Sequence, residues 1–421
     1  MTFRLSALGK PLAMFLQPAL PTPPGGAGPA AAATVPVPAA GARERTLLRY
    51  LVLPRPKDLV KAVVLPLGFV LGVVADGGTS TGELARASLV WAALELLVYQ
   101  ARYQWNDARG FAADQRHPDH IARGRLPGPI ERGRSHIAAS LGVAALRLGL
   151  VAVLALAVPQ IGAVLVAATL GVFGAALVYE RVRTAATGRA AFPVPLRPAL
   201  IGLWLMIGAG YAVRGLTGLA LAVDLGGRPG LIATAAAAMW ALGVVFCTSR
   251  WVLEAMCYAR VVDGRVVWRV RPDHAREHLL GLVRWLPAEV PPGTAPRSWR
   301  ALRARTPVTA PWNLALIVAG ATAALAGRLL VGPEGAAGSL AVAAAGALSA
   351  LGLAVGIRRR NVAALAGAAL MFAGLAITGT DRPGAALLPW AVVAIAHRCF
   401  CGQCADDIGH PARRLTMLRR A

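Results

Sequence analysis

The sequence predicts an all-α integral membrane protein, a bundle of nine or ten transmembrane helices whose functional loops face the cytoplasm. Of its 421 residues, 56% are hydrophobic and only 15% are charged, whereas soluble proteins carry about 25% charged residues. Apolar segments long enough to cross a bilayer, about 20 residues each, recur along most of the chain. We therefore expect a lipid bilayer as its surroundings and the cell membrane as its location.

Ten apolar segments are candidates for these helices, and the last of them is the shortest. They lie near residues 58–75, 87–103, 137–158, 161–179, 199–223, 230–249, 311–331, 336–356, 361–379 and 385–398. On this count the bundle occupies residues 46–398. A Pro/Ala-rich tail (1–45), which we expect to be disordered, precedes it, and a basic tail that contains cysteines (399–421) follows it.

The charges of the connections test this assignment, because cytoplasmic loops of membrane proteins carry an excess of Lys and Arg. Four connections are rich in arginine, and those between them are short and poor in positive charge. The basic connections are residues 104–134, 180–197, 250–310 and 358–360. We expect all four on the cytoplasmic side. Since the net charge of +24 comes from arginines that alternate with apolar blocks, we expect no nucleic-acid partner.

The insertion at about 255–310 and the C-terminal tail both contain potential metal ligands. In the insertion, a solvated helix face explains three side chains at helical spacing better than a metal site does: His274, Glu277 and His278. In the tail, reduced thiols or a lipidation site are alternatives to a zinc site for Cys399, Cys401 and Cys404.

Two carboxylates follow the second span. At the end of a membrane helix a negative charge costs free energy unless a cation lies next to it. Asp107 and Asp114 are seven residues apart, so on a continuous helix they share one face with Asn106 and Gly110 beside them. Mg²⁺ is typically held by one or two carboxylates together with substrate phosphates. The alternative is a solvated acidic loop end beside ordinary cytoplasmic arginines. No other partner for the two carboxylates is evident in the sequence.

Arginines surround this acidic pair, and a guanidinium group binds phosphate oxygens through paired hydrogen bonds. The candidates for phosphate binding here are Arg109, Arg116, Arg123 and Arg125. The sequence therefore predicts a site for Mg²⁺ and phosphate.

The order of these residues resembles two motifs of the UbiA superfamily of intramembrane prenyltransferases. Asn106-Asp107 and Asp114, followed by Arg125-Leu126-Pro127-Gly128, are similar to N-D-x-x-D-x-x-x-D and R-P-L-x-x-G. His117-Pro118 is most similar to the branch that contains the decaprenyl-phosphate phosphoribosyltransferases. Gly110 stands where the family has its middle aspartate, so Asp119 or water would have to replace that ligand. In span order the resemblance covers roughly residues 50–380, but the insertion at about 255–310 lies outside it.

Two further elements take their roles from the resemblance. Tyr179 and Arg183 stand where the family has Tyr-x-x-x-Lys, which implies that Arg183 clamps phosphate and Tyr179 donates a hydrogen bond. An interfacial anchor is the alternative. The segment that ends at Glu254 loosely resembles Lys-Arg-Tyr-x-Glu, which implies phosphate binding by Arg250 and a second metal ligand in Glu254, with Asp263 behind it. A structural Arg250–Glu254 pair is the alternative.

Arg214 lies inside the predicted fifth span. An ionisable residue within a membrane is a functional candidate by default, and substrate phosphate is its expected ligand. The alternatives are that Arg214 reaches an interface or pairs with Glu95.

The resemblance implies a Mg²⁺-dependent transferase that ionises a diphosphate donor and transfers a prenyl or phosphoribosyl group, with a polyprenyl or prenyl (di)phosphate as its partner. The expected catalytic residues are Asn106, Asp107, Asp114, Tyr179 and Arg183, and the expected metal ligands are Asp107, Asp114 and Glu254. One alternative is a terpene cyclase acting on a prenyl diphosphate. Another is a non-catalytic lipid binder or transporter.

Labelling of single cysteines in a cysteine-free background tests the orientation. We expect His120→Cys and Ala190→Cys to react with a membrane-impermeant maleimide from the same, cytoplasmic side, because both positions lie in basic connections. Asp224→Cys, in a short connection between them, should react from the other side. Labelling of residues 120 and 190 from opposite sides would contradict the span assignment.

Overall fold

The computed structural model describes residues 45–401 apart from 118–119, 189–192, 263, 269–275, 290–305, 333–337, 356–359 and 378. In these ranges the chain is a helical bundle with one two-stranded hairpin. The predicted N-terminal tail lies outside the described residues, except for Arg45. The C-terminal helix runs on to Cys401, so it includes the start of the predicted tail, where Cys399 is an exposed free thiol. The Cys401 side chain and Cys404 lie outside the described residues.

The chain order alternates long helices with short connecting elements. The first half contains α2 (Leu47–Val52), α3 (Pro56–Ala62), α4 (Val64–Asp76), α5 (Thr81–Ala93), the π-helical turn η1 (Leu94–Val98), α6 (Tyr99–Gln115), α7 (His120–Arg123), η2 (Ile130–Arg132), α8 (Gly133–Ala157) and α9 (Pro159–Ala186). The second half contains α10 (Pro198–Met206), α11 (Ala209–Ala220), α12 (Pro229–Ala255), η3 (Met256–Tyr258), β1 (Ala259–Val262), β2 (Arg265–Trp268), α13 (Glu277–Leu280), η5 (Gly281–Trp285), α15 (Pro311–Val331), α16 (Ser339–Val355), α17 (Arg360–Ile377) and α18 (Pro383–Cys401).

Six helices among the described residues are long and apolar enough to cross a membrane. They are Thr81–Gln115, Ile130–Ala157, Pro159–Ala186, Pro198–Ala220, Pro229–Ala255 and Pro311–Val331. These six coincide with the second to seventh predicted spans. The other four predicted spans are also helical, in α3 and α4, α16, α17 and α18. A count of nine or ten spans, and the cytoplasmic placement of the loops, stay predictions.

The second predicted span is longer than expected. We placed its end at residue 103, but α5, η1 and α6 form one helix from Thr81 to Gln115. A capping box starts it, since the Ser80 hydroxyl accepts from Glu83 N and the Glu83 carboxylate accepts from Ser80 N. At roughly 1.5 Å per residue, 35 residues measure about 52 Å, more than the hydrocarbon core of about 30 Å. The acidic motif therefore lies on a helix and not in a loop.

Several helix crossings depend on glycine. A Cβ atom on Gly218 of α11 would overlap the backbone oxygen of Leu65 on α4. One on Gly327 of α15 would overlap the backbone oxygen of Ala386 on α18, and Gly320 and Gly346 face each other where α15 crosses α16. Small residues allow membrane helices to approach closely. These glycines therefore allow close packing of the helices at these crossings.

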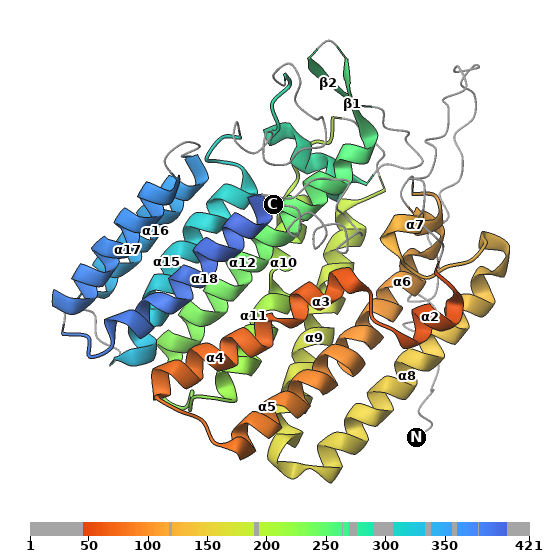
Figure 1. Cartoon of the computed structure of the whole chain (residues 1–421). Helices are drawn as coiled ribbons and strands as arrows, with labels where there is room; N and C mark the ends of the chain where they lie inside the picture. The colour runs from red at the N-terminus through yellow and green to blue at the C-terminus, as the bar shows by residue number, and fades with distance from the viewer. Residues whose placement is uncertain are drawn as a thin grey trace, which may run out of the picture.

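The longer connections gather at one end of the bundle. Figure 1 shows α7 and the β1–β2 hairpin at this end, whereas the α4–α5 and α8–α9 turns lie at the opposite end. The predicted insertion contains η3, the hairpin, in which Ala259 pairs with Trp268, and the short helices α13 and η5. The expectation of a solvated helix face was wrong, because Glu277 and His278 are 1% and 8% exposed. They are buried because α13 packs against α9, α10 and α12. His274 lies outside the described residues.

A pair of glycine substitutions tests the crossings. Gly218→Ala should lower the free energy of unfolding by about 1–3 kcal/mol, because overpacking forces the backbone to shift. Gly174→Ala on α9 is the matched control, since nothing lies within 4 Å of its Cβ position. Thermal unfolding in detergent micelles measures both. Equal melting temperatures for the two variants would contradict the close approach of α4 and α11.

Candidate functional site

The site begins on one face of α6. Asp107 and Asp114 are two turns apart on this continuous helix, as the spacing predicted. Both are buried, at 1% and 3% exposed. A Cβ atom on Gly110 would lie 3.2 Å from Asp114 Oδ2. Position 110, where the resembled family has its middle aspartate, therefore faces the same site, and glycine leaves that position without a carboxylate.

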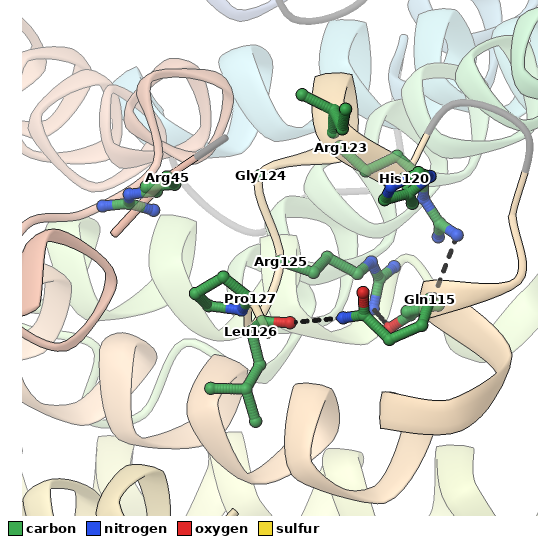
Figure 2. Close-up of a pocket in the computed structure, with 10 residues that line it drawn as sticks. Arg45, Gln115, His120, Arg123, Gly124, Arg125, Leu126 and Pro127 are labelled. Carbon is green, nitrogen blue, oxygen red and sulfur yellow. Dashed lines mark hydrogen bonds and ion pairs between the residues drawn. The ribbon is translucent and has the colours of Figure 1, made fainter. Parts of the chain in front are cut away.

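A rigid loop carries Arg125 over this face. Gly124 and Gly128 adopt the left-handed region, with φ of +57° and +115°, which glycine tolerates best. Between them, Leu126 is buried against Tyr50, and Figure 2 shows its carbonyl accepting a hydrogen bond from Gln115 Nε2 at 2.7 Å. The Arg-Leu-Pro-Gly motif thus holds one arginine in a defined direction.

The Arg125 guanidinium joins the two aspartates. Its Nη1 lies 3.1 Å from Asp107 Oδ1 and 3.2 Å from Asp114 Oδ2. Asn106 lies beside them, and in the amide orientation that satisfies its neighbours it accepts from Arg125 Nη1 and donates to Glu180 Oε1, both at 3.1 Å. Burial opposes the charge on Arg125, but the attraction of the two aspartates prevails and raises its pKa above the ordinary value.

Arg123 brings the second predicted motif into the site. Its Nη1 donates to Asp114 Oδ1 at 3.1 Å, and its Nη2 lies 3.0 Å from Glu254 Oε1 at the end of α12. The three predicted metal ligands, Asp107, Asp114 and Glu254, therefore meet around two guanidinium groups.

Three residues that we did not single out from the sequence also reach this cluster. Before α3, Arg55 Nη1 donates to Asp107 Oδ2 at 3.4 Å, and in α2 the Tyr50 hydroxyl donates to the same oxygen at 3.3 Å. From the insertion, Arg276 Nη2 donates to Asp114 Oδ1 at 3.0 Å. Nothing in the local sequence marks these residues, because each acts through a contact with a distant element.

His117, which we noted only as part of the resemblance, lies against Glu254. Its Nε2 is 3.6 Å from Glu254 Oε1. Burial, helped by the positive charge of Arg123, lowers the pKa of His117 to about 3. The imidazole is therefore neutral at pH 7, and the contact is not an ion pair at that pH.

The end of α9 forms the side of the cluster. Glu180 Oε2 lies 2.7 Å from Arg183 Nη2 and 3.4 Å from Arg109 Nε. The Arg183 guanidinium also lies 5.8 Å from the centre of the Tyr179 ring. The structure thus brings Tyr179, Arg183, Arg109 and Asn106 together around Glu180, a residue that we had not selected.

Three residues that we predicted to bind phosphate lie outside the cluster or at its edge. Arg116 is exposed at the end of α6, and Arg250 is half-buried one turn before Glu254 on α12. Arg214 pairs with Glu95 deep in the bundle, at 2.6 Å from Nε to Oε1 and 3.0 Å from Nη2 to Oε2, so the alternative of a Glu95 pair is the arrangement found. Asp119 and Asp263 lie outside the described residues.

The Arg214–Glu95 pair is enclosed by aromatic rings. The Arg214 guanidinium carbon lies 3.2 Å from the centre of the Tyr99 ring, and Nη2 lies 3.4 Å from the Tyr103 hydroxyl. Glu95 belongs to the π-helical turn η1, an element often found at functional sites. The pair neutralises both charges, which would otherwise be costly within a membrane.

The donors of the cluster fit Mg²⁺ in chemistry but do not form a closed cage. Asp107, Asp114 and Glu254 offer carboxylate oxygens, and Asp114 Oδ2 is buried and accepts no hydrogen bond despite its 3.2 Å contact with Arg125. Guanidinium groups lie between the carboxylates, and the described residues contain no group of three His, Cys, Asp or Glu side chains that could hold a metal. Such an arrangement suits an ion that arrives with a phosphate substrate and completes its shell there.

A pocket opens beside the cluster. It is a small, open depression lined by Arg45, Asp114, Arg123, Arg125 and the loop around them. In Figure 2, the Arg123 and Arg125 side chains come from either side of Gly124. Asp114 and two guanidinium groups therefore lie at the wall of a pocket that opens to the outside.

The expectation that the carboxylates have no other partner was wrong. Asp107 contacts Arg55 and Arg125, and Asp114 contacts three arginines. The sequence does not reveal this, because all four arginines lie outside α6, and Arg55 and Arg276 are far from it along the chain. Substitution of either aspartate is therefore expected to destabilise the fold, since it leaves buried guanidinium groups with fewer anionic partners.

A double-mutant cycle tests the Arg214–Glu95 pair. Glu95→Leu and Arg214→Met should each lower the free energy of unfolding by about 3–5 kcal/mol, because each leaves one buried charge unpaired. The double variant should be less destabilised than the two losses added together. Thermal unfolding in detergent provides the measurement. If the two losses of unfolding free energy simply add, the ion pair is contradicted. If the double variant no longer binds phosphate, Arg214 has the phosphate-binding role that we expected from the sequence.

Searches against protein-family models, curated proteins and solved structures found no match to this chain.

Proposed function

We propose that the chain is a membrane-embedded transferase of the UbiA type, which binds the phosphate end of a prenyl or polyprenyl (di)phosphate in the cluster and ionises a diphosphate donor. One observation carries this proposal. Three carboxylates meet around buried guanidinium groups at one end of an apolar bundle: Asp107 and Asp114 on α6 and Glu254 on α12. Glu254 follows Asp114 by 140 residues along the chain.

The arginines supply the affinity for phosphate. In the free protein Arg123 and Arg125 bind carboxylates, and a phosphate group offers the same kind of oxygen acceptor with more charge. Both arginines line the pocket beside the cluster, so a phosphate there could take over part of their hydrogen bonds. The carboxylates that are released would then hold Mg²⁺ accompanying the diphosphate.

The same groups would favour departure of the diphosphate. Negative charge develops on it as the bond to carbon breaks, and fixed positive groups stabilise that charge most strongly where water is excluded. Under this proposal Arg123 and Arg125, which line the pocket, supply these positive groups. Mg²⁺, when bound, neutralises further charge on the leaving group. Arg183, beside Asn106 and Tyr179, is suited to holding the donor in place.

The bundle interior supports an isoprenoid as the other end of the substrate. A small apolar pocket lies between α4, α11, α12, α15 and α18, lined by residues such as Leu219, Ala238 and Met239. Ala238 and Glu254 are on the same helix, 16 residues or about 24 Å apart at roughly 1.5 Å per residue. Under this proposal the apolar chain runs from the cluster along α12 in the direction of this pocket.

Ligand-induced stabilisation and turnover test the proposal together. In detergent, geranylgeranyl diphosphate should raise the melting temperature in the presence of Mg²⁺, because a ligand that binds only the folded state stabilises it. Asp114→Asn should lower turnover by at least about 100-fold and also lower the melting temperature of the free protein. Asp224→Asn, at the other end of the bundle, is the control.

The possible outcomes separate the candidate functions. Release of a cyclic hydrocarbon from a prenyl diphosphate without an acceptor would identify a cyclase. Mg²⁺-dependent stabilisation without turnover would identify a non-catalytic binder. An unchanged melting temperature with saturating prenyl diphosphate, prenyl phosphate and Mg²⁺ would contradict the isoprenoid proposal altogether.

A further inference from the structure

The insertion after α12 is firmly packed onto the end of the bundle. Leu279, Leu280 and Leu282 are each 1% exposed or less. The backbone just before them is also held, because Trp204 Nε1 of α10 donates to the His278 carbonyl at 3.0 Å. The Glu277 carboxylate accepts from the backbone N of Gly188, after α9, at 2.9 Å.

Aromatic rings from three helices fix the same segment. Trp285 packs edge-to-face against Trp204 of α10, with ring centres 5.5 Å apart, and against Trp312 of α15, at 6.4 Å. His278 packs against Trp251 of α12 at 4.8 Å. Such pairs add to the stability gained from burial alone. The segment from residue 276 to 286 therefore has one position relative to α10, α12 and α15.

This docking places one side chain of the insertion in the cluster. Arg276 immediately precedes α13, and its Nη2 donates to the Ala113 carbonyl at 2.9 Å and to Asp114 Oδ1 at 3.0 Å. Asp114 Oδ1 also accepts from Arg123 at 3.1 Å. Two guanidinium groups thus share one carboxylate oxygen, although like charges repel each other.

Positive charge is concentrated around Asp114. Arg123, Arg125 and Arg276 all contact it, Arg123 also contacts Glu254, and Arg125 also contacts Asp107. Arg276 is the more exposed of the two that share Asp114 Oδ1, at 17% against 7% for Arg123. Of these two, it is therefore the one more open to a ligand.

We propose that the insertion supplies Arg276 as a substrate-binding residue, which holds a phosphate oxygen of the isoprenoid diphosphate beside Asp114. This proposal rests on the proposed function, and it assigns a role to a segment outside the family resemblance. The tryptophan contacts serve to keep Arg276 at the site, and the backbone contact with Ala113 keeps its guanidinium oriented towards α6.

Binding of geranylgeranyl diphosphate with Mg²⁺ to the full-length protein in detergent tests this role. Arg276→Ala should raise the Kd about 10- to 100-fold, the range expected for loss of a hydrogen bond to a charged group. Arg276→Lys should recover part of the affinity, since it keeps the charge but not the planar donor pair. Arg284→Ala is the matched control, because Arg284 belongs to the same segment but donates to the Val194 carbonyl. The Kd of this variant for the diphosphate should stay within about twofold of the wild-type value.

Arg123→Ala serves as the reference for the site as a whole. If it weakens binding while Arg276→Ala leaves the Kd unchanged, Arg276 is only a structural contact and this proposal is overturned. If neither variant changes the Kd, the cluster does not bind the diphosphate and the proposed function fails as well. Melting temperatures of the free variants show that each one is folded, so a weaker Kd reports the lost contact.

Discussion

The arrangement of this end of the molecule depends on the cost of burying Asp107 and Asp114 at the end of a long membrane helix. A buried carboxylate without a counter-charge would lose several kcal/mol of solvation, and here each aspartate is almost fully buried. The counter-charges come from Arg55 before α3, from Arg125 in the loop after α7, and from Arg276 in the insertion. Segments far apart in the sequence are thereby tied to one face of α6.

The helical segments could be predicted from the sequence because apolar length is a local property. All ten predicted spans fall on helices. Among the described residues, six of these helices are long and apolar enough to cross a membrane. The end of the second span was misplaced because Gln104, Asn106 and Asp107 were taken as loop residues. In the structure their polar groups contact other elements, and those contacts allow the helix to continue to Gln115.

The candidate site was only partly predictable, for a related reason. The seven-residue spacing puts Asp107 and Asp114 on one face, and the pairing of Arg214 with Glu95 is one of the alternatives that the sequence allows. Arg55 and Arg276 could not be recognised, because the chain contains 44 Lys and Arg residues and nothing local distinguishes these two. The burial of Glu277 and His278 was missed because their polar character was taken as a sign of solvent, whereas α13 docks among three helices.

The paired state of the cluster has a consequence for how a substrate would bind under the proposed function. A phosphate that takes Arg123 and Arg125 away removes the arginine that contacts Glu254 and leaves Asp107 and Asp114 with fewer counter-charges. Loss of one partner of a buried pair costs about 3–5 kcal/mol. A divalent cation bound by those carboxylates would remove that cost. Under the proposed function, phosphate and cation affinities would therefore be coupled, and each ligand would strengthen the other by the same factor. The arginines that stabilise the fold in the free protein would thereby make the anion and the cation bind together.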